Sequence, residues 1–333
     1  MTEADESRRD KVTDPATAVR RFVTPGCHLS IGGFTVNRNP MAAVHEIIRQ
    51  GIDGLHLSAH SNGQGADELI GAGCVRRVEI AYGGSGIFAP TAIRFRKAVE
   101  TGAVGCEDYS NYQMALRYLA GAMGVPFLPT RSGLGTDILS RWGFSEAVRR
   151  DDPQLPDRKL VVIDNPFAAS DAVEKIVLVP ALTPDVTIIH AQAADPRGNV
   201  RIDGLPFADV EQAKAARHLV VTCETLVRPE TLRAAPDRNA IPFIHVDAVV
   251  PVHYGAYPTA CYGVYDYDPV YLKAYAEAAR DDDRYAAYLD AHVRELPDHA
   301  ALLSRVGPGR LDRLRADPET GYAVGLDRRR GPR

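Results

Sequence analysis

The chain contains the stretch Val186-Thr187-Ile188-Ile189, in which every side chain is branched at its β-carbon. An unbroken run of this kind is typical of a strand buried on both faces, as in the parallel sheet of an α/β protein. Similar short runs alternate with stretches of helical apolar spacing, which is the pattern of βαβ units. We therefore predict an α/β fold with a mostly parallel open sheet flanked by helices, with strands at residues 27–31, 55–58, 75–82, 160–163, 176–179, 186–191, 219–222 and 246–252.

Helices are predicted between and after these strands. Pro40 suits the start of a helix, because the N–H that proline lacks would have no partner there, and Gly51 suits the end of the same helix. The polar, proline-broken stretch 149–157 predicts a loop or an excursion from the core. Further helices are expected at residues 91–100, 112–123 and, as a helical C-terminal segment, 269–305.

The composition is that of a soluble globular protein. The chain has 333 residues, of which 45% are apolar and 25% charged, and its formal net charge is −4. Nucleic-acid binding would normally bring a basic stripe, and no apolar run approaches the roughly 20 residues of a membrane span. The polar start lacks the apolar segment of a signal peptide, so we expect a cytoplasmic protein.

The length suits one large α/β domain or two smaller ones. We expect a single domain at residues 12–310, after a disordered polar N-terminus at residues 1–11 and before a C-terminal tail at residues 311–333. The five cysteines are scattered, include no C-x-x-C pair and have an odd total. They are therefore predicted to be free thiols rather than a disulfide framework or a zinc site.

Several familiar catalytic and cofactor-binding motifs are missing from the sequence. There is neither a G-x-x-x-x-G-K-[ST] phosphate loop nor a G-x-G-x-x-G dinucleotide turn. His45-Glu46 does not continue into H-E-x-x-H, and Ile87 occupies the last glycine position of a G-x-S-x-G motif around Ser85. The ten histidines lack the spacing of metal ligands, so we predict no metal site.

Glycines follow two of the predicted strands and indicate a ligand cleft. Gly32-Gly33 comes after the strand at residues 27–31, and Gly83-Gly84-Ser85-Gly86 comes after the strand at residues 75–82. In open α/β sheets ligands bind beyond the carboxyl ends of the strands, and glycine lets backbone N–H groups approach a ligand closely. These residues predict a polar, glycine-lined cleft; the alternative is that they only form turns.

The first glycine pair belongs to a longer stretch, Ser30 to Pro40, that resembles the first-subunit signature of class I CoA-transferases: an apolar run, Gly-Gly-Phe, a short spacer and a proline. Arg38 departs from this signature, which has glycine two residues before the proline. From about residue 12 to about residue 310 the chain is similar to the α (A-type) subunit of glutaconate CoA-transferases. The resemblance implies the CoA-transferase fold, which is NagB/RpiA-like. The similar stretches include residues 82–86, 94–97, 107–110, 124–129, 163–167, 189–192, 221–224, 246–250 and 254–268.

The resemblance implies a chemistry that needs a second chain. In this family a glutamate carboxylate attacks an acyl-CoA, forming an acyl-glutamyl anhydride and then a glutamyl-CoA thioester, and the acceptor acid reverses these steps. The glutamate lies in a Ser-Glu-Asn-Gly motif of the β-type subunit, whereas this chain has Ser61-Asn62-Gly63 without it. The resemblance thus implies an α-type subunit without the catalytic nucleophile, which acts with a β-type partner in a heterotetramer or hetero-octamer. Coenzyme A thioesters would be its substrates, with no permanently bound cofactor.

The resemblance also assigns substrate contacts to this chain. Each tetrahedral intermediate carries an oxyanion that needs positioned hydrogen-bond donors. Asn111 matches a family amide, usually glutamine, that points into the site, and it is one methylene shorter. The remaining matched positions line the substrate pocket or the floor of the cleft: Ser85, Gly84, Gly86, Gly32, Gly33 and Phe34.

Structural roles compete with these assignments. Asn111 directly precedes a predicted helix, where asparagine is a preferred N-cap. Glu107 could be a site carboxylate, but a structural role is favoured. Four arginines are candidates for binding the second carboxylate of a dicarboxylic acyl group, although surface or structural roles are more common for arginine: Arg38, Arg94, Arg96 and Arg131.

Two other functions stay open at the level of the sequence. Related two-subunit proteins of this fold are hydrolases of CoA thioesters or ring-cleaving hydrolases, with a carboxylate of the α-type subunit near the site. Asn111 in place of a carboxylate favours the transferase. The same fold also serves sugar-phosphate isomerases and small-ligand-binding domains, but no basic residue adjoins the turn at residues 83–86.

Overall fold

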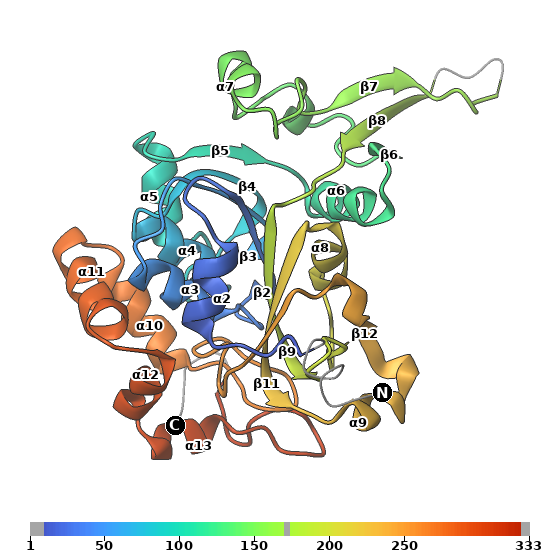
Figure 1. Cartoon of the computed structure of the whole chain (residues 1–333). Helices are drawn as coiled ribbons and strands as arrows, with labels where there is room; N and C mark the ends of the chain where they lie inside the picture. Colours follow the sequence, from blue (N-terminus) through green and yellow to red (C-terminus); the bar gives the residue numbers. More distant parts are fainter. Residues whose placement is uncertain (1–9, 170–173, 328–333) are drawn as a thin grey trace.

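The structure is a computed structural model that describes residues 10–169 and 174–327. Figure 1 shows a central sheet with helices on both sides and a smaller sheet that projects from this body. The strands are β1 (His28–Ile31), β2 (Phe34–Thr35), β3 (Leu55–Asn62), β4 (Val75–Gly83), β5 (Gly105–Asp108), β6 (Phe127–Thr130), β7 (Val161–Asp164), β8 (Lys175–Pro180), β9 (Val186–Ala194), β10 (Val200–Arg201), β11 (His218–Leu226), β12 (Asn239–Ile241) and β13 (Ala248–Pro251). The α-helices are α2 (Pro15–Phe22), α3 (Met41–Arg49), α4 (Gln64–Gly71), α5 (Ile93–Glu100), α6 (Asn111–Met123), α7 (Glu146–Asp151), α8 (Asp209–Ala215), α9 (Pro229–Arg233), α10 (Pro269–Ala278), α11 (Asp282–Leu289), α12 (His299–Val306) and α13 (Pro308–Leu314).

The larger sheet has a parallel core, which confirms the predicted fold class. Its strands lie in the order β13-β11-β9-β1-β3-β4-β5, and each neighbouring pair is parallel. The short β2 pairs with the end of β3, and β10 and β12 add an antiparallel edge beyond β9. After β1 the chain first forms β3, β4 and β5 on one side of it. It later forms β9, β11 and β13 on the other side. Strand order therefore reverses between β1 and β9, and ligands bind at such points in open α/β sheets.

Helices cover both faces of this sheet. α2, α3 and α4 pack on one face, and α6 and α8 pack on the other (Figure 1). Ile188 and Ile189 of β9 belong to the cores on opposite faces and are both fully buried, so the run at residues 186–189 has no polar alternation. Across the described residues we find no helix with both the length and the apolar character that a membrane crossing requires.

The predicted helical C-terminal segment is confirmed, and tyrosines attach it to the body. Tyr275 of α10 donates a hydrogen bond to Asp67 of α4 at 2.7 Å, and Tyr288 of α11 donates to Glu68 at 2.8 Å. The other carboxylate oxygen of Glu68 lies 2.9 Å from Nε2 of His45 in α3. These buried carboxylates thus have the hydrogen-bond partners that burial requires.

The packed domain extends beyond the expected boundaries. Of the polar N-terminus expected at residues 1–11, residues 1–9 lie outside the described part, but Lys11 donates to two carbonyl oxygens, each at 2.7 Å. The tail expected from residue 311 begins inside α13. Two residues of that expected tail, Leu314 and Ala323, are buried. Residues 328–333 of that tail lie outside the described part.

The smaller sheet corrects two details of the predicted topology. Residues 160–163 and 176–179 were expected in the parallel sheet, but β7 and β8 pair antiparallel with each other, and β6 completes the order β6-β8-β7. The stretch 149–157 does belong to an excursion from the core, but its start is the end of α7 and not a loop. All five cysteines are free thiols, as predicted.

Candidate active site

The two glycine turns come together at the carboxyl ends of β1, β3 and β4, and Asn62 joins them. Its Nδ2 donates to the carbonyl of Gly32 at 2.9 Å, while its own carbonyl accepts from the N–H of Gly84 at 2.9 Å. Its Oδ1 accepts from the N–H of Ala66 at 2.9 Å, at the start of α4. Asn62 is fully buried, so it fixes the turns at the edge of the sheet where a ligand is expected.

The backbone N–H groups of these turns bind within the chain. Gly32 donates to the carbonyl of Ile188 at 2.9 Å, and Gly33 donates to Oδ1 of Asp209 at 2.8 Å. Ser85 donates to the carbonyl of Ala89 at 2.8 Å and so closes its own turn. The glycines therefore permit close packing here, and the N–H groups of Gly32, Gly33, Gly84 and Ser85 are already engaged within the chain.

Gly33 and Gly86 form a matched pair for testing this packing. Both have positive φ, +86° and +59°, where a side chain is strained. A Cβ at Gly33 would also lie 2.6 Å from the carbonyl oxygen of Arg38, whereas one at Gly86 would meet nothing within 4 Å. Gly86→Ala should cost about 1 kcal/mol of unfolding free energy from the φ angle, and Gly33→Ala about 1–3 kcal/mol more from the clash. Urea unfolding of both variants measures the difference, and equal costs would contradict the packing argument.

Asn111 is the first residue of α6 and is not its cap, so the alternative N-cap role is wrong. Ser110 accepts from the N–H of Gln113 at 3.1 Å, and the Gln113 side chain accepts from the N–H of Ser110 at 3.0 Å, which makes a capping box. The Asn111 side chain instead accepts a hydrogen bond at its Oδ1 from Oγ of Ser61, at 2.5 Å. Its Nδ2 has no partner among the described residues and is left as a donor.

Two residues at the end of β3 that the sequence analysis did not select surround Asn111. Ser61 pairs in register with Phe34 of β2, and His60 Nε2 lies 3.0 Å from the carbonyl oxygen of Asn111. Burial lowers the pKa of His60, so its ring is neutral near pH 7 and Nε2 is the protonated nitrogen. The available signal was Ser61-Asn62-Gly63 itself, because Ser61 stands where the nucleophile motif has its glutamate.

Ser85 and Phe34 reach the same end of β3 from other segments. Ser85 is buried, and a Cβ on Gly63 would lie 2.6 Å from its Oγ and 2.7 Å from the carbonyl oxygen of Thr35. The Phe34 ring stacks on Phe207 with ring centroids 4.6 Å apart. The structure therefore brings the predicted residues together around the last three residues of β3, with Asn111 beside Ser61 and Ser85 beside Gly63.

Comparison with known proteins decides which family uses this arrangement. The model of the family described as Coenzyme A transferase matches residues 12–251. The chain belongs to the coenzyme A transferase family.

The closer relatives confirm the assignment to the α-type subunit. The A-type subunit of glutaconate CoA-transferase from Acidaminococcus fermentans is 40% identical over 95% of this chain and 98% of its own length. The A-type subunit of 3-oxoadipate CoA-transferase from Pseudomonas knackmussii is 34% identical over 88% of this chain and 97% of its own. The crystal structure of the Acidaminococcus fermentans glutaconate CoA-transferase matches with a TM-score of 0.90 and 41% identity, over 94% of this chain and 98% of that one. The CoA-transferase fold and the resemblance to the α subunit of glutaconate CoA-transferases are thus confirmed.

In this member of the family the four candidate arginines are engaged by acidic residues. Arg38 is buried, lies 2.9 Å from Oδ2 of Asp209 and also donates to the carbonyl of Leu205 at 2.8 Å. This pair explains the departure from the family glycine, because the guanidinium fixes the loop after β2 to α8. The other three form ion pairs as well: Arg94 with Asp282, Arg96 with Glu100 and Arg131 with Glu174. These contacts favour the structural and surface roles.

Glu107 has the structural role that the sequence favoured. It is fully buried on β5 and forms an ion pair with Arg149. It also accepts from the N–H groups of Gly143 at 3.0 Å and Phe144 at 3.2 Å. A buried carboxylate with this many partners holds the excursion after β6 against the sheet.

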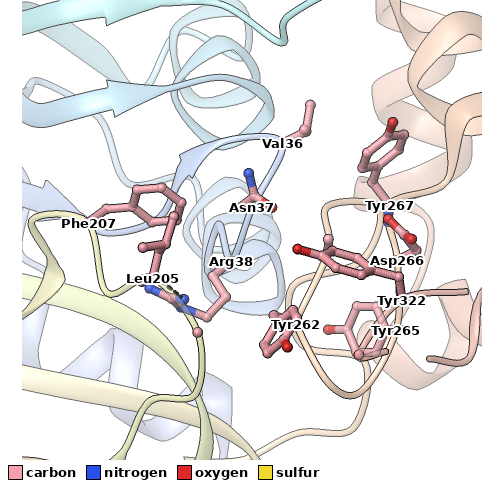
Figure 2. A pocket seen from close by; sticks show the side chains of 13 residues that line it. Val36, Asn37, Arg38, Leu205, Phe207, Tyr262, Tyr265, Asp266, Tyr267 and Tyr322 are labelled. Carbon is pink, nitrogen blue, oxygen red and sulfur yellow. Dashed lines mark hydrogen bonds between the residues drawn. The ribbon is translucent and has the colours of Figure 1, made fainter. Parts of the chain in front are cut away.

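A cavity of about 680 Å³ adjoins the site next to the loop after β2. Figure 2 shows Asn37 and Arg38 between Phe207 on one side and a group of tyrosines on the other. Five of the thirteen lining residues are aromatic, and this part of the lining suits a planar group. Phe207 links the cavity to the site, because it lines the cavity and stacks on Phe34. The tyrosines are Tyr262, Tyr265, Tyr267 and Tyr322.

One wall of this cavity depends on the buried carboxylate of Glu224 at the end of β11. Its Oε1 accepts from Tyr265 Oη at 2.6 Å and lies 2.8 Å from His190 Nε2, and its Oε2 accepts from the N–H of Tyr254 at 2.8 Å. Burial alone would raise the pKa of Glu224, but hydrogen bonds from His190 and His253 outweigh it and hold the pKa at about 2. Glu224 is therefore ionised throughout the neutral range.

This low pKa predicts a loss of stability in acid. Below the ordinary carboxyl pKa of 4.5 the unfolded chain binds the proton first, so the contribution of Glu224 is full above that value and disappears as pH falls toward 2. At pH 7 the free energy of unfolding of the native protein should be roughly 3 kcal/mol higher than that of the Glu224→Gln variant. This difference should shrink in acid. Chemical unfolding from pH 7 to 3 measures it. Exposed Glu100→Gln should show no such change, and a pH-independent gap for Glu224→Gln would contradict the assignment.

Two groups of potential metal ligands occur among the described residues, although the sequence predicted none. His190, Glu224 and Cys261 form one group and His28, His56 and Glu79 the other, with ligand atoms within 4.8 Å of one another. In each group the carboxylate is already engaged within the chain, Glu224 as described and Glu79 by an ion pair with a buried arginine. Both carboxylates are thus held by contacts within the chain.

Proposed function

We propose that this chain supplies oxyanion donors to a CoA-transferase active site whose nucleophilic glutamate belongs to a β-type subunit. The observation that carries the proposal is the hydrogen bond from Ser61 to Asn111. Because the Ser61 hydroxyl donates to Oδ1 of Asn111, the Nδ2 group of Asn111 is left as a hydrogen-bond donor at the end of β3. Asp209, the carboxylate next to Gly33, is neutralised by Arg38, so the site offers donors and no free nucleophile among the described residues.

The donors fit a reaction that passes through oxyanions. The partner's glutamate attacks the thioester carbonyl of the acyl-CoA, the C–S bond breaks and CoA thiolate leaves an acyl-glutamyl anhydride. The thiolate then attacks the glutamyl carbonyl, which releases the acid and leaves a glutamyl-CoA thioester. The acceptor carboxylate reverses these steps. Each tetrahedral intermediate bears an oxyanion, and we propose that the amide of Asn111 and the hydroxyl of Ser85 stabilise it.

The names of the relatives support a proposal for the substrate and the assembly. Glutaconate and 3-oxoadipate, which name two relatives, are dicarboxylic acids, and we propose an acyl group of that class. Coenzyme A thioesters are substrates, and no cofactor is bound permanently. Relatives that are each named as one subunit of an enzyme imply a partner, and we propose a β-type partner in a cytoplasmic heterotetramer or hetero-octamer.

Trapping the thioester tests this function. This chain and the product of a neighbouring reading frame that carries Ser-Glu-Asn-Gly are co-expressed, incubated with glutaryl-CoA and treated with borohydride. The mass of each subunit is then measured. We expect reduction of a glutamyl thioester on the partner and no change on this chain. Steady release of free CoA without an adduct on either chain would instead establish a hydrolase.

A further inference from the structure

One face of the small antiparallel sheet is apolar and partly exposed. Pairing places Phe127 opposite Pro180 and Pro129 opposite Leu178, and on the other side of β8 it places Ile163 opposite Ile176. Directly paired residues project to the same side of an antiparallel sheet. The outer face therefore consists of Phe127, Pro129, Val161, Ile163, Ile176, Leu178 and Pro180, and none of these side chains is polar.

The opposite face of this sheet is covered along β8, although Val162 of β7 on that face is 45% exposed. Val177 and Val179 of β8 alternate with the outer-face residues, are fully buried and pack in a core with Tyr118 of α6. On the outer face Phe127 is 45% exposed and Ile163 is 36% exposed. Monomeric soluble proteins rarely leave a continuous apolar face of this kind in water, so it marks a docking surface.

The outer face runs into a groove that ends at the candidate active site. A cavity of about 760 Å³ is lined by outer-face residues together with Tyr112 and Phe167, which are 61% and 93% exposed. Tyr112 directly follows Asn111 in α6. Ser132, at the other end of β6, lies 2.8 Å from Ser110 through their hydroxyl oxygens, so the groove is fixed to the start of α6.

We propose that the outer face and this groove bind the β-type subunit, which brings its glutamate to Asn111. The inference rests on the proposed function, because the site has donors and needs a carboxylate from another chain. The groove is the apolar surface that adjoins Asn111. A second copy of this chain would cover the same face without supplying a free carboxylate nucleophile, since its Glu107 and Asp209 are buried in ion pairs.

Charged residues border the far end of the outer face. Arg131, just after β6, pairs with Glu174, just before β8, whereas the pair of Lys175 with Asp164, at 2.7 Å, projects to the opposite face. All four side chains are partly or largely exposed. An apolar centre with a polar rim is the usual anatomy of a protein interface, and exposed aromatic residues such as Phe167 and Tyr112 are typical anchors.

Charge-introducing variants test the surface directly. In Ile163→Glu and Phe167→Glu a carboxylate would enter the apolar centre, and we expect each to weaken binding of the purified β-type subunit by about 30-fold or more, the effect of a hot-spot residue. Ile244→Glu is the matched control, because Ile244 is 70% exposed and lies outside the groove. Unfolding midpoints of the free chains show whether the variants fold. Unchanged affinity of both variants would overturn the proposal.

A photoreactive benzophenone side chain at position 167 identifies the occupant. In the full complex it should cross-link to the β-type subunit, whereas cross-linking of two copies of this chain would overturn the proposal. A native chain that fails to bind a β-type subunit would overturn both this proposal and the proposed function. If Ile163→Glu weakens the complex but the native complex gives no thioester adduct, the docking surface is supported and the proposed function is contradicted.

Discussion

Replacing Asn111 with alanine is expected to lower kcat for CoA transfer by about 100- to 1,000-fold, the usual cost of removing one oxyanion donor. KM should change little, because the donor acts mainly on the charge that develops in the transition state. Asn111 is exposed at the start of α6, and Ser110 caps that helix without it. The variant should therefore fold and bind its partner normally, which steady-state kinetics and size-exclusion chromatography of the complex would establish.

Two further variants separate donation from mere packing. Asn111→Gln restores the amide that is usual in the family and should recover most of kcat. Ser61→Ala keeps the amide but removes the hydrogen bond that orients it, so its loss should be smaller than that of Asn111→Ala and should again fall on kcat. If Asn111→Ala raises KM and leaves kcat intact, the residue contributes to ground-state binding and not to oxyanion stabilisation.

The pairing of Ser61 with Asn111 lies beyond local sequence patterns. The two residues are 50 positions apart and meet because the parallel register of β3 and β4 places the end of β3 next to the start of α6. Strand register depends on the whole sheet and has no local signature. The resemblance to the CoA-transferase family identified Asn111, Ser85 and the glycine turns as candidate site residues. Only the three-dimensional structure identified the Ser61 hydroxyl that orients the Asn111 amide.

The parallel core was predictable where its strands contain runs of apolar and β-branched residues. β9 shows this best, since its β-branched run is required by burial on both faces. β2 has only two residues, and β5, with the sequence Gly-Cys-Glu-Asp, has no apolar run, so neither is revealed by periodicity. β7 and β8 are also rich in valine and isoleucine, and only long-range pairing determines that they form a separate antiparallel sheet.

Helix α4 was missed for a different reason. Its start contains Gly63 and Gly65, which are typical of a turn, because glycine disfavours helix interiors. The helix nevertheless begins at Gln64, where the Asn62 side chain accepts the N–H of Ala66, and almost all of its residues are buried. Tertiary packing thus overrides the local propensity. Gly65 also permits close contact, since a Cβ there would lie 3.3 Å from Oδ1 of Asn62.

Replacing Arg117 with methionine is expected to lower the free energy of unfolding by about 3–5 kcal/mol, the cost of leaving one member of a buried ion pair alone. Arg117 of α6 is 1% exposed and pairs with Glu79 of β4, which is equally buried. Burial would raise the pKa of Glu79, but Arg117 and His56 outweigh it and hold that pKa well below its usual range. Without Arg117 the carboxylate retains only His56 Nε2, 3.0 Å away, and must stay charged with less compensation or take up a proton.

The same arginine connects three parts of the molecule. Its Nε donates to the carbonyl of Pro180 in the small sheet at 3.2 Å, and its backbone carbonyl accepts from the N–H of Leu182 at 3.0 Å. The guanidinium also lies over the ring of Tyr109, 4.2 Å from its centroid. Because α6 carries Asn111 and the small sheet carries the proposed docking face, Arg117→Met should reduce transfer activity as well as stability.

A double variant tests whether charge or shape is responsible. In Glu79→Gln/Arg117→Met no buried charge is left unpaired, so the double variant should be more stable than Arg117→Met alone. Thermal unfolding of both variants and of the native chain measures the difference. If the double variant is less stable by the sum of the two single effects, the pair contributes through packing and the buried charge is not the cause. If Arg117→Met costs less than about 1 kcal/mol, the ion pair behaves like one at the surface, and α6 must be held by its apolar contacts with the core around Met114 and Tyr118.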